Sequence, residues 1–257
     1  MPSAPEARTG RSRVLPPIAT VTVAALGLLT LVGTGTAHAS APASSQPNPK
    51  SAQLECVSTS TGPYQLQVER HLGRQPDGIQ SVRDCLAIQS FQQREGITTT
   101  GIADPATYRM TVVAKARANP GVGTRCPVRR GRVACVDQTR QLMWVQKGKR
   151  VVFPVTPVRT GLKAYKTRNG WHRIFFRKLH ERSRLYNNAP MPYSQYFSGG
   201  QAFHGTRNDI FTKGSAGCVN LRIPDAARLW KVLHKKDRAY VFGHRPALKR
   251  NGAPRPS

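Results

Sequence analysis

The sequence has few acidic residues, no set of apolar runs that would cross a membrane repeatedly, and no long helical repeats. These absences exclude a multi-span transporter and a solenoid protein. Its 257 residues hold 12 Asp and Glu against 40 Lys and Arg, which gives a formal net charge of +28. Because 39% of the residues are hydrophobic and only 20% are charged, the composition predicts a folded chain that attracts polyanions.

The first forty residues have the pattern of an export signal. A basic start precedes an uncharged run over 18–32, and Ala37-His38-Ala39 supplies small residues at the two positions that define cleavage. We therefore expect a signal peptide over 1–39, cleaved after Ala39, and a secreted or cell-wall protein outside the cytoplasmic membrane. An uncleaved N-terminal anchor is the alternative. Both interpretations disfavour a nucleic-acid partner.

Polar segments bound the part of the chain that is expected to fold. A Pro/Ser/Ala linker is predicted over 40–53, because it has nothing to bury, and a polar basic tail over 244–257. Between them the patterns predict a small all-α domain of three helices over 54–118 and a mainly β domain over 124–243.

The five cysteines predict two disulfides and one free thiol. An oxidising compartment favours pairing, and an odd count leaves one cysteine over. We expect Cys56 to pair with Cys85 in the helical stretch and Cys126 with Cys135 across a turn-rich segment. The remaining cysteine, Cys218, is either a dimer bridge or a reactive group. Because there is no Cys-x-x-Cys pair, no metal site is predicted, and no cofactor is expected.

Helical periodicity predicts helices that begin near 65, 82 and 105 in the first stretch. The Ile-Gln-Ser-Phe-Gln-Gln run at 88–93 and the Gly-Ile-Ala-Asp-Pro-Ala-Thr run at 101–107 resemble the small three-helix peptidoglycan-binding domain. That resemblance implies attachment to the cell wall. The alternative is a helical bundle that only supports its neighbour.

Strand patterns dominate the second stretch. Runs at 141–145 and 150–155 predict a hairpin, and further strands are expected at 171–176 and 239–242. The segment 223–233 has a helical apolar stripe. The expected fold is an antiparallel β-sandwich or barrel with one helix.

Residues that could perform nucleophilic catalysis gather near the end of this stretch. The Cys218 thiol needs a base or a positive environment to become a thiolate, and His204 can take its proton if the intervening loop folds back. Gly217 allows a close approach to a substrate carbonyl, whose oxyanion the neighbouring amides could hold. Ser215 and Asn220 are placed to orient the loop by hydrogen bonds.

This pattern resembles the catalytic domain of the L,D-transpeptidases (YkuD type). That family carries a His-Gly, a variable gap, and then Ser or Thr followed by His-Gly-Cys, an aliphatic residue and Asn or Arg. Here the two parts are His204-Gly205 and the Ser-Ala-Gly-Cys-Val-Asn segment at 215–220. The resemblance extends over most of 132–243, through Thr-Gly at 160–161, the loop at 167–170 and Met-Pro-Tyr at 191–193.

The resemblance implies a role for each residue of the motif. Cys218 maps onto the nucleophile, His204 onto the general base, and Gly217 with the Cys218 amide onto the oxyanion hole. The substrate-binding set is Ser215, Asn220, Tyr193 and Gly205, with Tyr193 lining the donor cleft. Two departures affect these expectations: Ala216 stands where the family usually has His, and Arg168 stands where it commonly has Pro.

The implied reaction is formation of 3→3 cross-links in peptidoglycan. The thiol would attack the carbonyl that follows diaminopimelate in a tetrapeptide stem, expel D-Ala, and pass the acyl group to an amine of a neighbouring stem. Carbapenem-type β-lactams are the implied inhibitors. Alternatives are an L,D-carboxypeptidase, a non-catalytic wall-binding protein and an extracellular polyanion binder. The twelve basic residues over 147–184, with Glu181 as the one acid, are either a solvated face or an attachment to anionic wall polymers.

Overall fold

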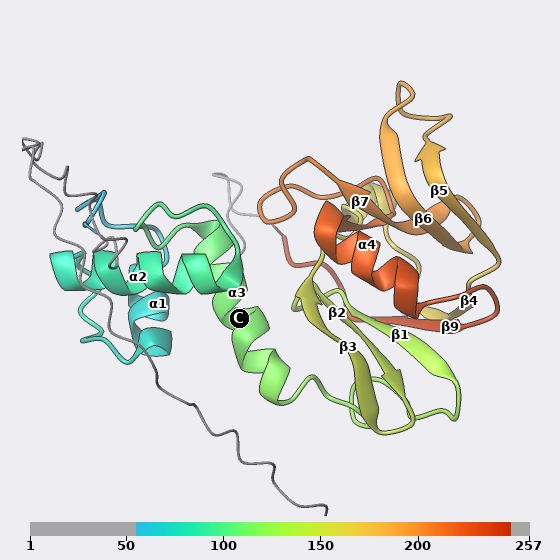
Figure 1. Cartoon of the computed structure of the whole chain (residues 1–257), viewed down its shortest axis with the longest axis horizontal. Helices are drawn as coiled ribbons and strands as arrows, with labels where there is room; N and C mark the ends of the chain where they lie inside the picture. The colour runs from blue at the N-terminus through green and yellow to red at the C-terminus, as the bar shows by residue number, and fades with distance from the viewer. Residues whose placement is uncertain (1–54, 248–257) are drawn as a thin grey trace, which may run out of the picture. The chain divides into compact units, whose positions relative to one another are not determined.

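The computed structural model of the protein describes residues 55–247 (Figure 1). The expected signal peptide, the linker and residues 248–257 of the expected tail lie outside the described residues. Within the described range, no helix combines the length and apolar character needed to cross a membrane.

The N-terminal part contains the three expected helices, α1 (Gln65–Leu72), α2 (Val82–Glu95) and α3 (Pro105–Ala118). Ser81 begins α2 with a reciprocal cap, because its hydroxyl accepts from the amide of Asp84 while the Asp84 carboxylate accepts from the Ser81 amide. Proline stands at the start of α3, and glycines in the left-handed conformation follow α1 and α2. Local sequence signals thus set all three helices.

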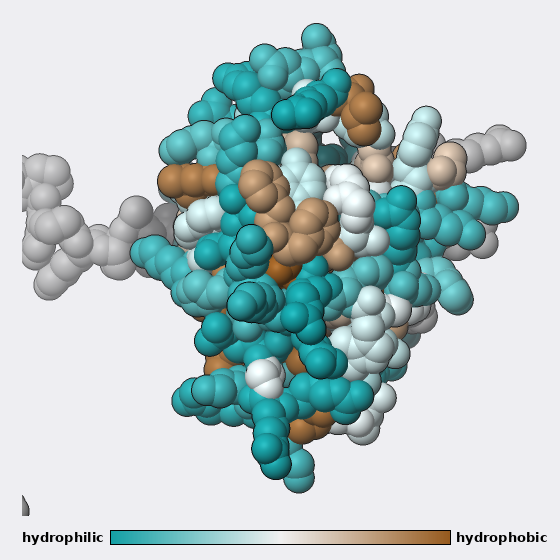
Figure 2. All heavy atoms as spheres, turned by 90° about the vertical axis from the view of Figure 1, so that its right-hand side faces the viewer, coloured by the Kyte–Doolittle hydropathy of each residue, from teal (hydrophilic) through white to brown (hydrophobic). Residues whose placement is uncertain are grey.

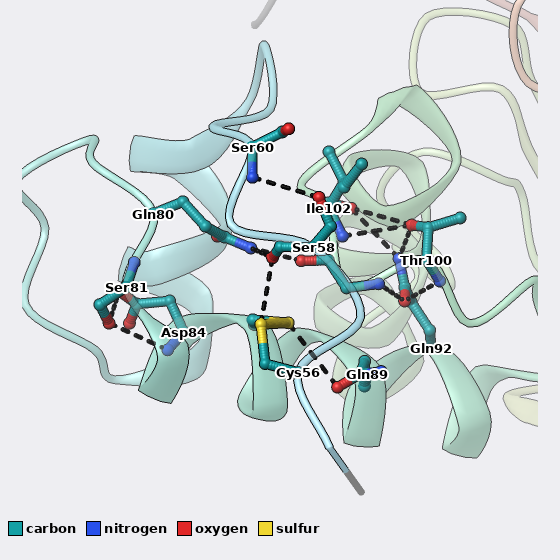
Figure 3. The surroundings of a disulfide bond; sticks show 12 residues. Cys56, Ser58, Ser60, Gln80, Ser81, Asp84, Gln89, Gln92, Thr100 and Ile102 are labelled. Carbon is teal, nitrogen blue, oxygen red and sulfur yellow. Dashed lines mark hydrogen bonds between the residues drawn. A yellow bond between two sulfur atoms is a disulfide. The ribbon is translucent and has the colours of Figure 1, made fainter.

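A buried glutamine ties the helices to the loop between α2 and α3 (Figure 3). The Gln92 amide nitrogen donates to the hydroxyls of Thr100 (2.8 Å) and Thr107 (2.7 Å). Its oxygen accepts from the amides of Thr100 (2.8 Å) and Gly101 (2.9 Å). Gln92 therefore satisfies backbone groups that the turn would otherwise leave unpaired, which explains why two of the runs noted in the sequence meet here.

Both expected disulfides are present, Cys56–Cys85 in the helical part and Cys126–Cys135 in the β-rich part. Cys218 is free. The other four cysteines pair with one another, so Cys218 has no disulfide partner within the chain.

The C-terminal part is mainly β, as predicted, and is built of two sheets (Figure 1). The first has the order β3-β2-β1-β9-β4, with β1 Arg132–Asp137, β2 Leu142–Lys147, β3 Arg150–Pro157, β4 Gly170–Arg173 and β9 Arg238–Phe242. The second has the order β5-β6-β7-β8, with β5 Phe176–Arg182, β6 Pro190–Ser198, β7 Gln201–Thr206 and β8 Val219–Arg222. A short 3-10 turn, Lys163–Tyr165, and helix α4, Ile223–Val232, complete the elements.

Two strand pairs run parallel, which the expectation of an antiparallel body did not include. They are β1 with β9 and β7 with β8. The strand expected over 171–176 is also divided between the sheets, because β4 ends at Arg173 and β5 begins at Phe176. Ile174 between them is fully buried in the core, so the chain passes from one sheet to the other at this point.

The main core lies between the sheets and α4. Phe203, Val219 and Leu221 of β7 and β8 pack with Leu229 of α4 and with Val136 of β1. Each large apolar side chain buried in this way contributes about 1.5–3 kcal/mol to folding. The strands that carry the motif are therefore held in a rigid core.

A second core joins the helices to β1–β3, since Met110 and Val113 of α3 pack with Leu142 and Trp144 of β2. Buried Arg109 of α3 crosses the same boundary and donates 2.7 Å to the carbonyl oxygen of Gln141. The helical and β-rich parts of the described range, 55–247, accordingly belong to one compact unit.

Candidate active site

Parallel pairing of β7 with β8 brings the separated parts of the motif together. In this register His204 is the partner of Asn220. Cys218 immediately precedes β8, and its thiol accepts a hydrogen bond from the backbone of Ala202, which lies in β7 two residues before His204. The structure thereby brings His204 beside the segment that holds Cys218 and Asn220, although His204 lies 16 residues before Asn220 in the sequence.

The loop before β8 is fixed by hydrogen bonds to its own backbone. The Ser215 hydroxyl accepts from the amide of Gly217 at 3.1 Å and donates to the carbonyl oxygen of Cys218 at 2.5 Å. The Thr167 hydroxyl donates to the carbonyl oxygen of Gly217 and accepts from the amide of Gly161, each at 2.9 Å. The Thr/Gly loop noted in the sequence therefore holds the segment that presents the thiol.

Gly217 occupies a conformation that disfavours other residues. Its φ is +110°, and a Cβ added there would lie 2.7 Å from Nε2 of Gln201. Its amide already binds Ser215. Gly217 can therefore join an oxyanion hole only after releasing that bond.

The Cys218 thiol is half-buried and protonated at rest. Its Sγ lies 3.8 Å from the carbonyl oxygen of Gly200, to which the S–H donates weakly. Burial raises the pKa of the thiol, and a hydrogen bond from the Ala202 backbone opposes the rise only in part. A neutral thiol is thus the ground state.

His204 is buried, with 8% of its surface exposed, and is neutral. Its Nδ1 lies 2.9 Å from the carbonyl oxygen of Gly205, and its Nε2 lies 2.7 Å from the side-chain nitrogen of Asn220. Burial lowers the pKa of His204 to about 4; the Gly205 carbonyl opposes the shift and the charge of Arg159 adds to it. Among the described contacts, no hydrogen bond joins His204 to Cys218.

Arg159 organises this arrangement, and the sequence reasoning missed it. Its guanidinium donates to Oδ1 of Asn220 through Nε (2.9 Å) and Nη2 (2.7 Å), and its backbone pairs with that of Asn220. Because Oδ1 of Asn220 faces Arg159, the amide nitrogen faces His204, whose Nε2 must then accept and whose Nδ1 donates. Arg159 is one of twelve basic residues over 147–184, and nothing in the sequence distinguishes it as a buried one.

Two predicted substrate contacts lie against α4. The Tyr193 ring is 6.4 Å from that of Trp230, and Tyr193 packs on the main core. A Cβ at Gly205 would lie 3.2 Å from Cβ of Ala226, so Gly205 lets α4 approach the sheet. Substrate contact by Tyr193 and Gly205 stays a prediction.

The donor set at this site suits nucleophilic chemistry through a thiol. Over the described part of the chain, no group of three or more His, Cys, Asp or Glu side chains is placed to hold a metal ion. The thiol, a neutral imidazole and backbone amides are the groups that a carbonyl substrate would meet at Cys218.

Two family models match the chain. The YkuD model, described as the L,D-transpeptidase catalytic domain, matches residues 131–241, and the model of a peptidoglycan binding domain matches residues 76–110. A comparison with curated proteins finds no match.

Solved structures of L,D-transpeptidases are similar to this chain. One from Stackebrandtia nassauensis is 33% identical, with a TM-score of 0.60, and the match covers 75% of this chain and 98% of that one. One from Xylanimonas cellulosilytica is 21% identical over 76% of this chain and 100% of that one, with a TM-score of 0.44. One from Mycobacterium smegmatis is 16% identical over 44% of this chain and 59% of that one, with a TM-score of 0.40.

Proposed function

The chain belongs to the L,D-transpeptidase family. We propose that it is an exported enzyme that forms 3→3 cross-links in peptidoglycan through an acyl-enzyme on Cys218. The observation that carries the proposal is the free thiol of Cys218 directly before β8, beside the strand β7 that carries His204 opposite Asn220. The other four cysteines are in disulfides, so Cys218 is the free thiol of the chain.

In the first step, Sγ of Cys218 attacks the carbonyl carbon between diaminopimelate and the terminal D-Ala of a tetrapeptide stem. The thiol proton passes to Nε2 of His204 and then to the departing amine of D-Ala, so a C–N bond breaks as the C–S bond forms. Because Asn220 donates to Nε2 at rest, this proton transfer requires His204 to exchange its Asn220 contact for the thiol.

Transfer of the thiol proton to His204 becomes favourable only when a substrate carbonyl is bound. A protonated thiol and a neutral imidazole of low pKa do not ionise each other at rest. A bound carbonyl accepts the negative charge as it develops, with the Cys218 amide as the nearest backbone donor in the loop. The proton moves in concert with attack, and the resting enzyme stays unreactive.

In the second step, an amine of a neighbouring stem attacks the thioester and the Cys218 thiol leaves, which joins the two stems. If water attacks, the same intermediate gives an L,D-carboxypeptidase product. The helical part, which matches a peptidoglycan binding domain over 76–110, would hold the enzyme on its substrate. Carbapenem-type β-lactams would acylate the same thiol, since they also offer a carbonyl to a nucleophile.

Mass spectrometry of the exported protein with a diaminopimelate tetrapeptide, with and without a second stem, tests the proposal. We expect a thioester on Cys218, loss of D-Ala and a joined product, with none of these in Cys218→Ala. Loss of D-Ala without joining would identify the carboxypeptidase. Binding to the wall without an adduct on Cys218 would indicate a non-catalytic protein and would overturn the proposed enzymatic function.

A further inference from the structure

A second feature of the β-rich part lies away from the thiol. A hollow of about 330 Å³ opens where β1 and β9 begin, and its lining comes from two loops that are distant in sequence: Arg129, Arg130, Gly131, Arg132, Lys236, Asp237 and Arg238. Figure 2 shows that the side of the molecule that carries β4 and β9 is largely hydrophilic.

The hollow carries excess positive charge. Asp237 is its single acid, and the carboxylate is already bound by Nε of Arg132 at 2.7 Å. The other four cations of the lining make no ion pair with any described residue. Four cations that repel one another around one depression are stabilised by an anion with several charges.

An exposed aromatic ring orders two of these cations. The guanidinium of Arg129 lies 5.1 Å from the ring centre of Trp171 and that of Arg238 lies 5.9 Å from it. Trp171 is 40% exposed and rests on Tyr240, with 4.8 Å between ring centres. Stacking fixes a guanidinium while leaving its N–H edge free, so the cost of ordering the side chain on binding is reduced.

The hollow and the contacts that lead to the thiol loop lie at opposite ends of β1. Arg132 begins β1 at the hollow, and Gln138 follows its other end, where it donates to the carbonyl oxygen of Thr167. Thr167 in turn binds Gly217. The six residues of β1 span roughly 20 Å, so an occupant of the hollow would not block the thiol.

We propose that this hollow is a binding site for an anionic wall polymer of phosphodiester-linked units. Guanidinium groups match phosphate oxygens in geometry and charge, and repeated phosphates would meet several of the four free cations at once. The choice of a wall polymer rests on the proposed export and wall function. The site differs from the basic stretch over 147–184 that the sequence indicated, because the lining residues lie at 129–132 and 236–238.

Binding of the exported protein to purified walls tests the site. The variant Arg129→Gln/Arg130→Gln/Arg238→Gln removes three cations of the hollow and spares the Arg132–Asp237 pair. The matched control Lys178→Gln/Arg182→Gln/Arg184→Gln removes three exposed cations from β5 and the loop after it. Walls that keep their phosphate polymers are compared with walls from which these have been extracted by acid.

We expect the hollow variant to bind intact walls at least tenfold more weakly and the control to change less than threefold. The slope of log affinity against log salt should fall by about 2–3 in the hollow variant, because each cation–phosphate contact releases about one counterion. Soluble poly(glycerol phosphate) should compete, and polygalacturonate should compete poorly. An Arg129→Lys/Arg130→Lys/Arg238→Lys variant should recover part of the binding, which excludes misfolding as the cause.

Equal weakening of the two triple variants would overturn the site, since net charge would then explain binding. Unchanged binding to extracted walls, or equal competition by polygalacturonate, would overturn the phosphodiester chemistry. Turnover of the soluble tetrapeptide should be the same in the hollow variant and in the wild type. Absence of that turnover in the wild type would count against the proposed enzyme and not against the hollow.

Discussion

The side-chain amide of Asn220 donates to Nε2 of His204 at 2.7 Å, and so occupies the nitrogen that would receive the thiol proton. Arg159 holds that amide in one orientation by two hydrogen bonds to its oxygen. A protonated Nε2 could not accept from Asn220, so the contact stabilises neutral imidazole. Asn220 and Arg159 therefore act as positioning residues that keep His204 uncharged until substrate arrives.

The first prediction concerns the pKa of His204. Asn220→Ala removes the donor to Nε2, so the pKa of His204 should rise from about 4 by about one unit. Arg159→Met should raise it as well, because it removes a nearby positive charge and frees the amide to turn. NMR titration of the imidazole measures both changes. An unaltered pKa in both variants would contradict the positioning role.

The second prediction concerns acid stability. The pKa of His204 is about 4 in the folded protein against 6.5 in the reference state, so the unfolded chain binds more protons between these values. The contribution of His204 to the free energy of unfolding is therefore complete above pH 6.5 and is lost as the pH falls toward 4. The loss should reach about 3 kcal/mol.

Denaturant unfolding at several pH values measures this loss. His204→Gln should be less sensitive to pH over the same window. The pKa of His71 is lowered too, chiefly by burial. A His71→Gln variant therefore shows how much of the pH dependence of unfolding belongs to this second histidine. Parallel curves for the wild type and His204→Gln would show that His204 is not buried in its neutral form.

The third prediction concerns the reactivity of the thiol. Because burial raises the pKa of Cys218, the rate of alkylation by iodoacetamide should still be rising above pH 9 in the free enzyme. Mass spectrometry should find one label, since the other four cysteines are in disulfides. A plateau near pH 7 would instead reveal a thiolate–imidazolium pair at rest.

The helices and the cysteine pairing could be predicted because their causes are local. The Ser81 cap, Pro105 and the glycines after α1 and α2 act within a few residues. The disulfides follow from counting cysteines in two short stretches. The expected peptidoglycan-binding and catalytic families could also be predicted, because each part of their motifs is a short contiguous run of residues.

The parallel strand pairs and Arg159 could not be predicted in the same way. Which strand lies beside β1 or β7 depends on how the two sheets pack, and short apolar runs do not encode their neighbours. Arg159 resembles any other arginine in a basic stretch until Asn220, 61 residues away, is placed beside it. Side-chain networks of this kind are set by tertiary structure.

The fourth prediction tests whether the loop conformation at the thiol is required. Gly217→Ala places a Cβ where φ is +110° and where Nε2 of Gln201 is 2.7 Å away. A non-glycine residue in such a conformation costs about 1–3 kcal/mol, so Cys218 acylation should slow by about tenfold or more while the core remains folded. Stopped-flow measurement of acylation by a carbapenem, with thermal unfolding as the check on folding, gives both quantities.

Gly200→Ala is the matched control, because the Gly200 carbonyl accepts the weak hydrogen bond of the thiol but an added Cβ meets no atom within 4 Å. We expect it to acylate at nearly the wild-type rate. Gln201→Ala combined with Gly217→Ala separates the two causes: it removes the steric contact and leaves the backbone strain. If the double variant recovers fully, contact with Gln201 was the whole cause. If Gly217→Ala alone acylates at the wild-type rate, the positive φ of Gly217 has no part in presenting the thiol.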